Sequence, residues 1–231
     1  MAARSVPVLE TPQVEAPLVT ELIVGESLVV LEAREGWLRV VVPGHATALD
    51  ARGYSGWTRP EGLVEAPGWD PKLTVVAPNG AGLPLGARLG GNGGLPDGRA
   101  APGPPHARPS NKPVVASPVE ISRGLLGLPY RWGGTDSTTG MDCSGLVFRV
   151  MGLLGVAVPR DASDQFGRAP YRSRDGWEGV LAGDLVFFGE GSVTHVGFYL
   201  GDGAYISEHG SSGAVVRGMD EDPYWGFARY R

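Results

Sequence analysis

The chain has 231 residues, a formal net charge of −5 and 42% hydrophobic residues, which is enough apolar material for an ordinary globular core. Charged residues make up 19% of the chain without forming a basic cluster, so electrostatics argues against nucleic acid as a partner. The 37 glycines and 20 prolines predict many short strands and turns with few long helices.

Residues 1–20 lack the continuous apolar stretch of a secretory signal or a membrane span, and Pro7, Pro12 and Pro17 interrupt them. For the sequence as it stands we therefore expect a cytoplasmic protein without a membrane partner. An export signal removed ahead of Met1 would reverse that expectation.

Residues 1–66 are predicted to hold a small β barrel, because short apolar runs alternate with turn residues from Val19 to Glu65. The runs are residues 22–24, 27–31, 37–42 and 54–57. Turns are expected at Gly25-Glu26 and Glu35-Gly36, and the core is expected to include Trp37, Val40 and Trp57. Tyr54 either packs in this barrel or lines a ligand site.

Residues 67–116 are rich in glycine and proline, and breaks such as residues 78–80 and 100–105 leave few strands possible. Only residues 73–76, 83–89 and 114–115 have the pattern to pair. Two interpretations stay open: a shortened second barrel followed by a proline-rich linker, or a mostly irregular linker. His45, in a barrel loop, and His106, in the proline-rich stretch, are expected at the solvated surface.

Residues 117–231 change in pattern and predict an α+β domain. A short helix over residues 118–126 and a helix beginning near Cys143 come first. Four strands are then predicted at residues 184–188, 195–200, 204–208 and 214–217.

Cys143 is the only cysteine, so an intramolecular disulfide is excluded and the thiol is either a small buried apolar group or a reactive one. A helix-like apolar period starts at Leu146, and Gly140, Asp142 and Ser144 supply turn and capping chemistry before it. Cys143 is thus expected in the first helical turn. The positive end of the helix dipole there would lower the pKa of the thiol, with Asp142 partly opposing it.

A cysteine nucleophile needs a base, and His195 is the best placed of the four histidines. Alternation puts His195, Gly197 and Tyr199 on one face of the predicted strand, and Val196, Phe198 and Leu200 on the other. A polar histidine beside a glycine suits the wall of a cleft.

A third group should hold the imidazole, and its identity depends on the hairpin after this strand. A three-residue loop at Gly201–Gly203 would set Leu200 opposite Ala204 and Gly197 opposite Ser207, with His195 opposite His209. Ser207 would then be diagonal to His195 on the same face, whereas a two-residue turn would shift the pairing and turn Ser207 away.

Several segments of the C-terminal half resemble the NlpC/P60 cysteine peptidases: residues 130–134 (YRWGG), 142–145 (DCSG), 159–165 (PRDASDQ), 183–188 (GDLVFF) and 195–201 (HVGFYLG). The resemblance covers about residues 117–231. It implies a reduced papain-like fold that hydrolyses peptides of bacterial peptidoglycan with Cys143 as nucleophile and His195 as general base. Tyr130 would line the site near the oxyanion, which the Cys143 N–H would help to stabilise.

The third residue of that family is most often histidine, and this sequence has Ser207 at the matching position. A serine oxygen can accept a hydrogen bond from imidazole but orients it less well than a packed ring, so His209 is the alternative. The resemblance also implies a substrate-binding set made of Tyr130, Trp132, Asp142, Ser144, Asp161 and Tyr54.

The first 66 residues resemble a bacterial SH3-like domain of the kind attached to cell-wall hydrolases. Together with Arg160-Asp161 they resemble the subgroup of γ-D-glutamyl-L-diamino acid endopeptidases, which trims muropeptides bearing a free N-terminal L-alanine. The Asp161 carboxylate would pair with that ammonium group, although it can also simply cap a helix. Tyr54 would close the end of the cleft.

Three functions stay open at this point: a cytoplasmic endopeptidase of cell-wall recycling, a catalytically weakened peptidoglycan-binding protein, and an exported hydrolase of intact wall. The sequence predicts no metal site and no cofactor, since it has no metal-ligand cluster and no phosphate-binding glycine loop. The accepted diamino acid and the oligomeric state are open as well.

Overall fold

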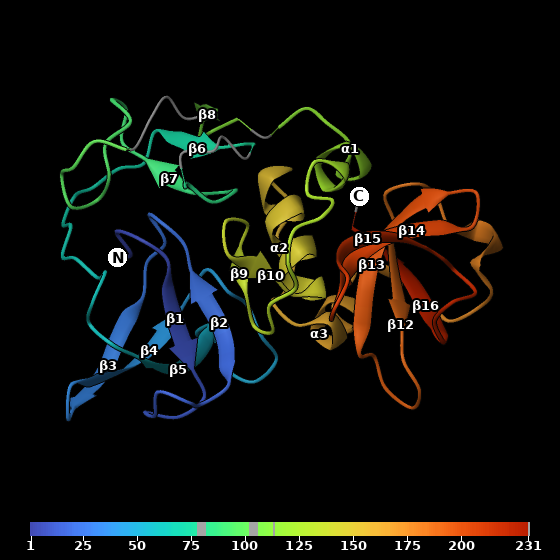
Figure 1. The fold of residues 1–231 in the computed structure, drawn as a ribbon, viewed down its shortest axis with the longest axis horizontal. Helices are drawn as coiled ribbons and strands as arrows, with labels where there is room; N and C mark the ends of the chain where they lie inside the picture. Colours follow the sequence, from blue (N-terminus) through green and yellow to red (C-terminus); the bar gives the residue numbers. More distant parts are fainter. Residues whose placement is uncertain (78–81, 102–105, 113, 231) are drawn as a thin grey trace. The chain divides into compact units, whose positions relative to one another are not determined.

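A computed structural model describes residues 1–77, 82–101, 106–112 and 114–230, and the chain forms two compact units (Figure 1). The N-terminal unit comprises Met1–Val114 together with Trp132–Gly140, and the C-terminal unit comprises Val115–Arg131 together with Met141–Arg231. The division predicted between residues 66 and 67 stays a prediction. In the described part of the chain, no helix has the length and apolar character needed to span a membrane.

The N-terminal unit contains a five-stranded antiparallel sheet in the order β2-β1-β5-β4-β3. Its strands are β1 (Val6–Leu9), β2 (Leu18–Leu22), β3 (Val29–Arg34), β4 (Trp37–Val42) and β5 (Tyr54–Thr58). The predicted turn at Glu35-Gly36 is confirmed, because both residues have positive φ and Arg34 pairs with Trp37 across a two-residue loop. Strand β1 was not predicted, and the barrel of the SH3-like interpretation stays a prediction.

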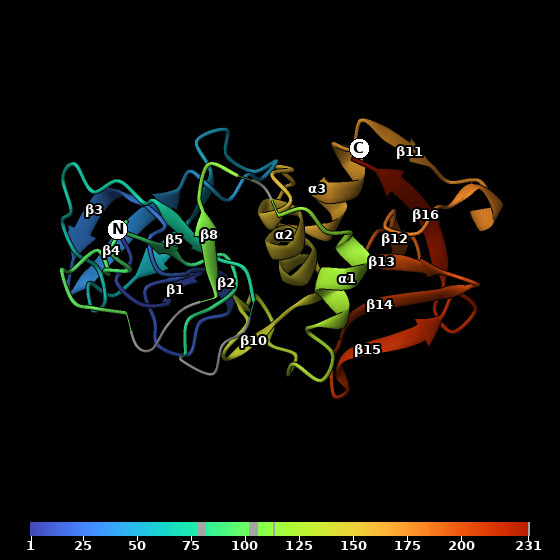
Figure 2. The same cartoon turned by 90° about the horizontal axis from the view of Figure 1, so that it is seen from above.

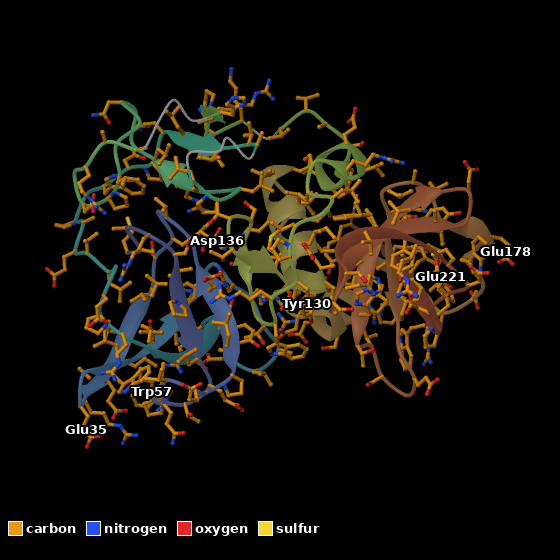
Figure 3. The ribbon with its side chains drawn as sticks, viewed as in Figure 1. Glu35, Trp57, Tyr130, Asp136, Glu178 and Glu221 are labelled. Carbon is orange, nitrogen blue, oxygen red and sulfur yellow. The ribbon has the colours of Figure 1, made fainter. Side chains whose placement is uncertain are left out.

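The core of this sheet is aliphatic, formed by Ala2, Val6, Val8, Leu22, Val40 and Val42. Trp37 is buried as predicted, under the guanidinium of Arg59 at 4.1 Å from the ring centroid. Trp57 is only half-buried, with the Arg34 guanidinium 4.9 Å from its ring, so the prediction that it fills the core is wrong (Figure 3). Stacking on arginine stabilises an indole that remains partly in water.

A second, three-stranded sheet in the N-terminal unit has the order β7-β6-β8. Its strands are β6 (Leu73–Val75), β7 (Arg88–Leu89) and β8 (Ala107–Pro109). Strand β8 lies in the stretch predicted as a linker; as an edge strand it tolerates Pro109, which pairs with Leu73. The predicted break at residues 78–80 lies outside the described residues, as do residues 102–105 of the break predicted at 100–105.

Residues 132–140 pack with the N-terminal unit, although residues 115–131, which belong to the C-terminal unit, separate them from the rest of it in the sequence. They include β9 (Thr135–Asp136), which pairs with β10 (Gly140–Met141) in a short ribbon. Thr135 donates its hydroxyl hydrogen to the Glu21 carbonyl at 2.7 Å, and Ser137 Oγ accepts from the Leu85 N–H at 2.8 Å. These buried hydrogen bonds replace water that the polar groups lose.

The C-terminal unit has the predicted α+β architecture, a six-stranded antiparallel sheet in the order β11-β16-β12-β13-β14-β15 with helices on one side (Figure 2). The strands are β11 (Tyr171–Ser173), β12 (Leu185–Phe188), β13 (His195–Gly201), β14 (Ala204–His209), β15 (Gly213–Gly218) and β16 (Tyr224–Arg229). The helices are α1 (Pro118–Arg123), α2 (Cys143–Leu153) and α3 (Ala162–Gly167), and a 3₁₀ turn covers Trp177–Gly179. All four predicted strands are present; β11 and β16 were not predicted.

The hairpin between β13 and β14 has a different loop from the predicted one, but the pairing of the two strands near His195 is the predicted one. Asp202 and Gly203 have positive φ and form a two-residue loop, so Gly201 rather than Leu200 pairs with Ala204. A bulge between Tyr199 and Gly201 absorbs one residue, and Tyr199 pairs with Tyr205 as the predicted alternation requires. The predicted loop is wrong, but the strand faces that followed from it are right.

Gly197 allows the two strands of this hairpin to pack closely. A Cβ at this position would lie 2.5 Å from the Ile206 carbonyl oxygen and 3.0 Å from the Ser207 Cβ. The absence of a side chain is thus a packing requirement beside His195.

Candidate active site

Cys143 is the first residue of α2, as predicted, and it is 7% exposed. Asp142 caps this helix: its carboxylate accepts from the Gly145 N–H at 2.6 Å and from the Ser144 hydroxyl at 3.1 Å. An extended residue with a short polar side chain is the standard start of a helix. The cap therefore fixes the backbone that carries the thiol.

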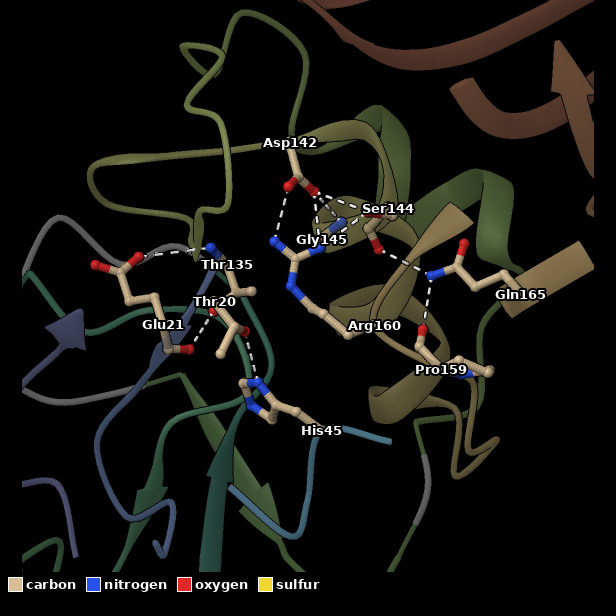
Figure 4. Close-up of polar contacts among 10 residues, drawn as sticks. All are labelled: Thr20, Glu21, His45, Thr135, Asp142, Ser144, Gly145, Pro159, Arg160 and Gln165. Atoms are coloured by element: carbon tan, nitrogen blue, oxygen red, sulfur yellow. Dashed lines mark hydrogen bonds and ion pairs between the residues drawn. The ribbon is translucent and has the colours of Figure 1, made fainter. Parts of the chain in front are cut away.

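A buried ion pair fixes the cap in turn (Figure 4). Arg160 is 1% exposed, and its two terminal nitrogens lie 3.0 and 2.7 Å from the two Asp142 carboxylate oxygens. One of these nitrogens also donates to Ser144 Oγ at 2.9 Å, while the Gln165 amide donates to the Ser144 and Pro159 carbonyls. Paired hydrogen bonds of this kind hold a charge in the interior. Asp142 and Ser144 thus have clear partners within the protein, and substrate contact by either stays a prediction.

The thiol of Cys143 is protonated in the free protein. Burial raises its pKa to about 12 and the Asp142 charge adds to the rise, whereas the Val196 and Ser144 N–H groups and the Arg160 charge oppose it. The expectation of a lowered pKa is wrong, because loss of water around the sulfur outweighs the helix dipole. The contact with the Val196 N–H nevertheless places the sulfur beside the residue that follows His195.

His195 begins β13, partly buried, and its Nε2 lies 3.0 Å from His209 Nε2. Burial, together with the nearby His209, lowers the pKa of His195 to about 4. In the described residues no hydrogen bond joins the Cys143 sulfur to this ring. Thiol and imidazole are therefore both neutral near pH 7.

Of the two candidates for the third group, the structure brings His209 to His195. Ser207 is fully buried, and its hydroxyl donates to the Val196 carbonyl. That bond supports the backbone next to the base, while His209 contacts the base itself. A bulky ring at 3.0 Å restrains an imidazole more than a distant hydroxyl does.

His209 contacts a network of polar side chains that was not predicted from the sequence. Tyr205 Oη lies 3.1 Å from His209 Nε2 and donates its proton to Asp222. Arg217 donates to His209 Nδ1 at 3.5 Å, and its Nε lies 3.3 Å from the Asp222 carboxylate. Tyr205 shares a strand face with Ser207 and could have been found by alternation, but Asp222 lies in a loop with no sequence signal.

Tyr130 and Glu208 are electrostatically coupled to the Cys143 region. Burial raises the pKa of Tyr130 to about 12, with contributions from the charges of Cys143 and Asp142 (Figure 3). Glu208 is fully buried and neither carboxyl oxygen has a hydrogen-bond partner among the described residues. Burial raises the pKa of Glu208 to about 8, with Asp142 adding to the rise. Glu208 was not foreseen, because a charged residue in an alternating strand is normally expected in water.

The remaining predicted substrate-binding residues fall on both units. Asp161 occupies the N-cap position of α3 without a side-chain cap hydrogen bond. Tyr54 begins β5 and is half-buried, and Trp132 is 70% exposed; both belong to the N-terminal unit. Their contact with substrate stays a prediction.

His45 corrects a further expectation. It is fully buried rather than solvated, and its Nδ1 lies 2.8 Å from Thr20 Oγ1 (Figure 4). Its Nε2 lies 3.2 Å from a Glu26 carboxylate oxygen. Hydrogen bonds to both ring nitrogens offset the free-energy cost of burying a polar ring. His106 is exposed as expected. In the described residues no group of three His, Cys, Asp or Glu side chains is arranged to hold a metal ion.

Comparison with known proteins gives one family, the NlpC/P60 family, which matches residues 127–228. The chain is 30% identical to the gamma-D-glutamyl-L-lysine dipeptidyl-peptidase of Bacillus subtilis (strain 168), over 81% of this chain and 71% of that protein. It is 29% identical to the protein of the same name from Bacillus cereus (strain ATCC 10987 / NRS 248), over 82% of this chain and 66% of the relative.

Among solved structures, an NlpC/P60 family protein from Bacillus cereus ATCC 10987 superposes on this chain with a TM-score of 0.82. The sequences are 22% identical, and the match covers 98% of this chain and 97% of the other. A likeness at this level of identity shows a shared fold.

Proposed function

Because this chain belongs to the NlpC/P60 family, whose fold is papain-like, we propose that it is a cysteine endopeptidase acting on peptidoglycan-derived peptides. One observation carries the proposal. Cys143 begins α2, a helix that packs against β13, and β13 begins with His195, whose Nε2 is hydrogen-bonded to a second histidine. A thiol, a neutral base and a group that orients the base are the parts that nucleophilic cysteine catalysis requires.

The reaction follows from these parts. The Cys143 thiol gives its proton to Nδ1 of His195, since Nε2 faces His209, and the sulfur attacks the scissile carbonyl carbon. The carbonyl oxygen becomes an oxyanion that the Cys143 N–H at the start of α2 stabilises. The imidazolium protonates the leaving amine, which leaves a thioester on Cys143. Water, deprotonated by His195, then hydrolyses the thioester and restores the thiol.

The Cys143 thiol and the His195 imidazole are both neutral in the free protein, as expected for a reaction that starts only when a peptide is bound. A thiol with a pKa of about 12 and an imidazole with a pKa of about 4 do not form an ion pair on their own. Substrate that approaches the sulfur removes the remaining water, so proton transfer and attack become coupled.

The proposed bond is the one between γ-D-glutamate and a diamino acid, in peptides with a free N-terminal L-alanine. Two relatives named gamma-D-glutamyl-L-lysine dipeptidyl-peptidase support this choice. Asp161, at the N-cap position of α3, supplies the carboxylate that pairs with the alanine ammonium group. Such peptides exist only after glycan or acyl groups have been removed, which fits a cytoplasmic role in cell-wall recycling. In this proposal the N-terminal unit, which carries Tyr54 and Trp132, is SH3-like, and substrate contact by these two residues stays a prediction.

The test is to incubate the protein and a Cys143→Ala control with L-Ala-γ-D-Glu-diamino acid peptides and to identify the products by mass. Release of L-Ala-γ-D-Glu by the wild type alone is expected. Asp161→Ala should raise KM for peptides with a free alanine amine and leave N-acetylated peptides unaffected; equal losses on both would remove the assigned role of Asp161. Intact peptidoglycan serves as a third substrate, and preference for it would favour a wall hydrolase.

A second candidate, a peptidoglycan-binding protein with weak or no turnover, is favoured by one observation. The raised thiol pKa and the lack of a sulfur–imidazole hydrogen bond in the described residues are both unfavourable for nucleophilic attack. Binding of the peptide without products, measured equally for wild type and Cys143→Ala, would identify this function.

A further inference from the structure

The partners of His209 restrict where its proton can lie. Arginine has only donors, so the Arg217 nitrogen 3.5 Å from His209 Nδ1 requires a lone pair at that nitrogen. A neutral His209 then carries its proton on Nε2. Burial lowers the pKa of His209, which is consistent with a neutral ring.

Tyr205 leads to the same conclusion independently. A phenol has one proton, and Tyr205 donates it to the Asp222 carboxylate. Towards His209 Nε2, 3.1 Å away, the phenol oxygen can therefore only accept. Two partners on different strands, Arg217 on β15 and Tyr205 on β14, thus assign the same tautomer to His209.

This tautomer determines the proton position of His195. With hydrogen on His209 Nε2, the His195 Nε2 at 3.0 Å must be an acceptor, and the single proton of neutral His195 then sits on Nδ1. That nitrogen is the one left to receive the thiol proton, since His209 occupies Nε2. A protonated Nδ1 cannot act as a base.

We propose that Arg217 and Asp222 are positioning residues that hold His209 as its Nε2–H tautomer and thereby restrain the His195 base. Arg217 acts directly on His209 Nδ1, and Asp222 acts by taking the Tyr205 proton. His195 can accept the thiol proton only in the other tautomer, in which one proton lies on His209 Nδ1 and the other on His195 Nε2. This reactive form is the minor form in the free protein. The assignment of tautomers stands on the contacts alone; its effect on Cys143 rests on the proposed function.

The charged and titratable neighbours of this pair come from several elements. Asp142, before α2, acts on His195, while Glu221 and Asp222, in the loop before β16, act on His209. Glu221, which Figure 3 labels, also pairs with Arg217, and its Oε2 lies 3.1 Å from Arg217 Nη2. The arginine is thus held by two carboxylates while it contacts the ring, so it remains a donor fixed in place.

The proposal is tested by ¹⁵N NMR of histidine-labelled protein, because protonated and unprotonated imidazole nitrogens resonate far apart. Signals are assigned from His195→Gln and His209→Gln variants. The wild type should show His209 protonated on Nε2 and His195 on Nδ1. Arg217→Met should raise the population of the other form, with protons on His209 Nδ1 and His195 Nε2, and Arg217→Lys, which keeps a donor, should restore the wild-type pattern.

A matched control and a kinetic readout complete the test. Arg229 has the same 31% side-chain exposure as Arg217 and is paired with Asp184 instead of contacting a histidine, so Arg229→Met should change neither tautomer. Alkylation of the single cysteine, Cys143, at pH 7 should be about tenfold faster in Arg217→Met, as expected for loss of one charge-assisted hydrogen bond. Asp222→Ala, in a loop, should act in the same direction and replaces Arg217→Met if that variant does not fold.

Two results would overturn the inference: His209 protonated on Nδ1 in the wild type, or tautomers unchanged in both Arg217→Met and Asp222→Ala. If NMR shows the predicted tautomers but the protein hydrolyses no peptide, the proposed function is refuted and the inference on His209 still holds.

Discussion

Each compact unit contains a hydrogen-bonded histidine, His45 fully buried and His195 partly buried, and their partners differ. In the N-terminal unit both nitrogens of His45 have polar partners, Thr20 and Glu26. In the C-terminal unit the one hydrogen-bond partner of the His195 ring within the described residues is His209, on Nε2. A ring with both nitrogens occupied stabilises a fold, whereas a ring with one nitrogen available can transfer a proton. The two histidines therefore differ in the number of partners as well as in burial, and the free nitrogen is the difference that bears on proton transfer.

The largest expected effect concerns His195. Without an imidazole at this position the thiol has no proton acceptor, so His195→Gln should lower kcat at least ~10³-fold on the L-Ala-γ-D-Glu-diamino acid peptide. Thermal unfolding should change little, because the ring has only one hydrogen-bond partner in the described residues. A variant with more than a tenth of wild-type turnover would contradict the assignment of the base.

His45 is the matched control, with the opposite expectation. His45→Ala removes a fully buried ring and leaves Thr20 and Glu26 without that partner, so unfolding should be easier by about 2–4 kcal/mol. Turnover per folded molecule should be unchanged. Chemical denaturation and active-site titration measure the two quantities separately, and a fall in kcat equal to that of His195→Gln would erase the contrast between the histidines.

His209 and Ser207 should differ in the same way but more weakly. His209→Ala should lower kcat about 10- to 100-fold, because the base loses the ring that orients it. Ser207→Ala should cost about 1 kcal/mol of stability, through the lost bond to Val196, with a small change in kcat. Full turnover in the double variant would show that His195 needs no third group.

Glu208 gives an effect on stability alone, and one that depends on pH. Its folded pKa of about 8 lies above its ordinary value of 4.5, so the folded chain favours the neutral carboxyl. The stability from this group is fully present below pH 4.5 and is lost as the pH rises towards 8. Glu208→Gln should therefore match the wild type near pH 4.5 and be more stable by about 1–3 kcal/mol at pH 9. Equal denaturation midpoints at both pH values would argue against a buried, unpartnered carboxyl.

The sequence predicts most of the C-terminal unit, because periodicity and capping signals are local. The α2 start at Asp142-Cys143, the four central strands and the shared face of His195 and His209 all follow from spacing. The hairpin was predicted with the wrong loop; a bulge, which has no simple sequence signal, restored the register.

The features that could not be predicted from the sequence depend on burial by residues that are distant along the chain. The raised pKa of Cys143 reflects desolvation by residues distant along the chain, and the loop residue Asp222 reaches Tyr205 only after folding. Arg160 illustrates the same limit, since nothing local shows that it is buried against Asp142. The complete burial of His45 likewise follows from Thr20 and Glu26, which its own loop does not reveal.

The central claim is that Cys143 is acylated by a γ-D-glutamyl peptide with His195 as base. Rapid mixing of the protein with L-Ala-γ-D-Glu-diamino acid, acid quenching and intact-mass analysis test it most directly. The wild type should form an L-Ala-γ-D-Glu adduct on Cys143 with release of the diamino acid, and His195→Gln should form no adduct. Peptide that binds but stays intact, with no adduct on Cys143 at any time, would contradict it.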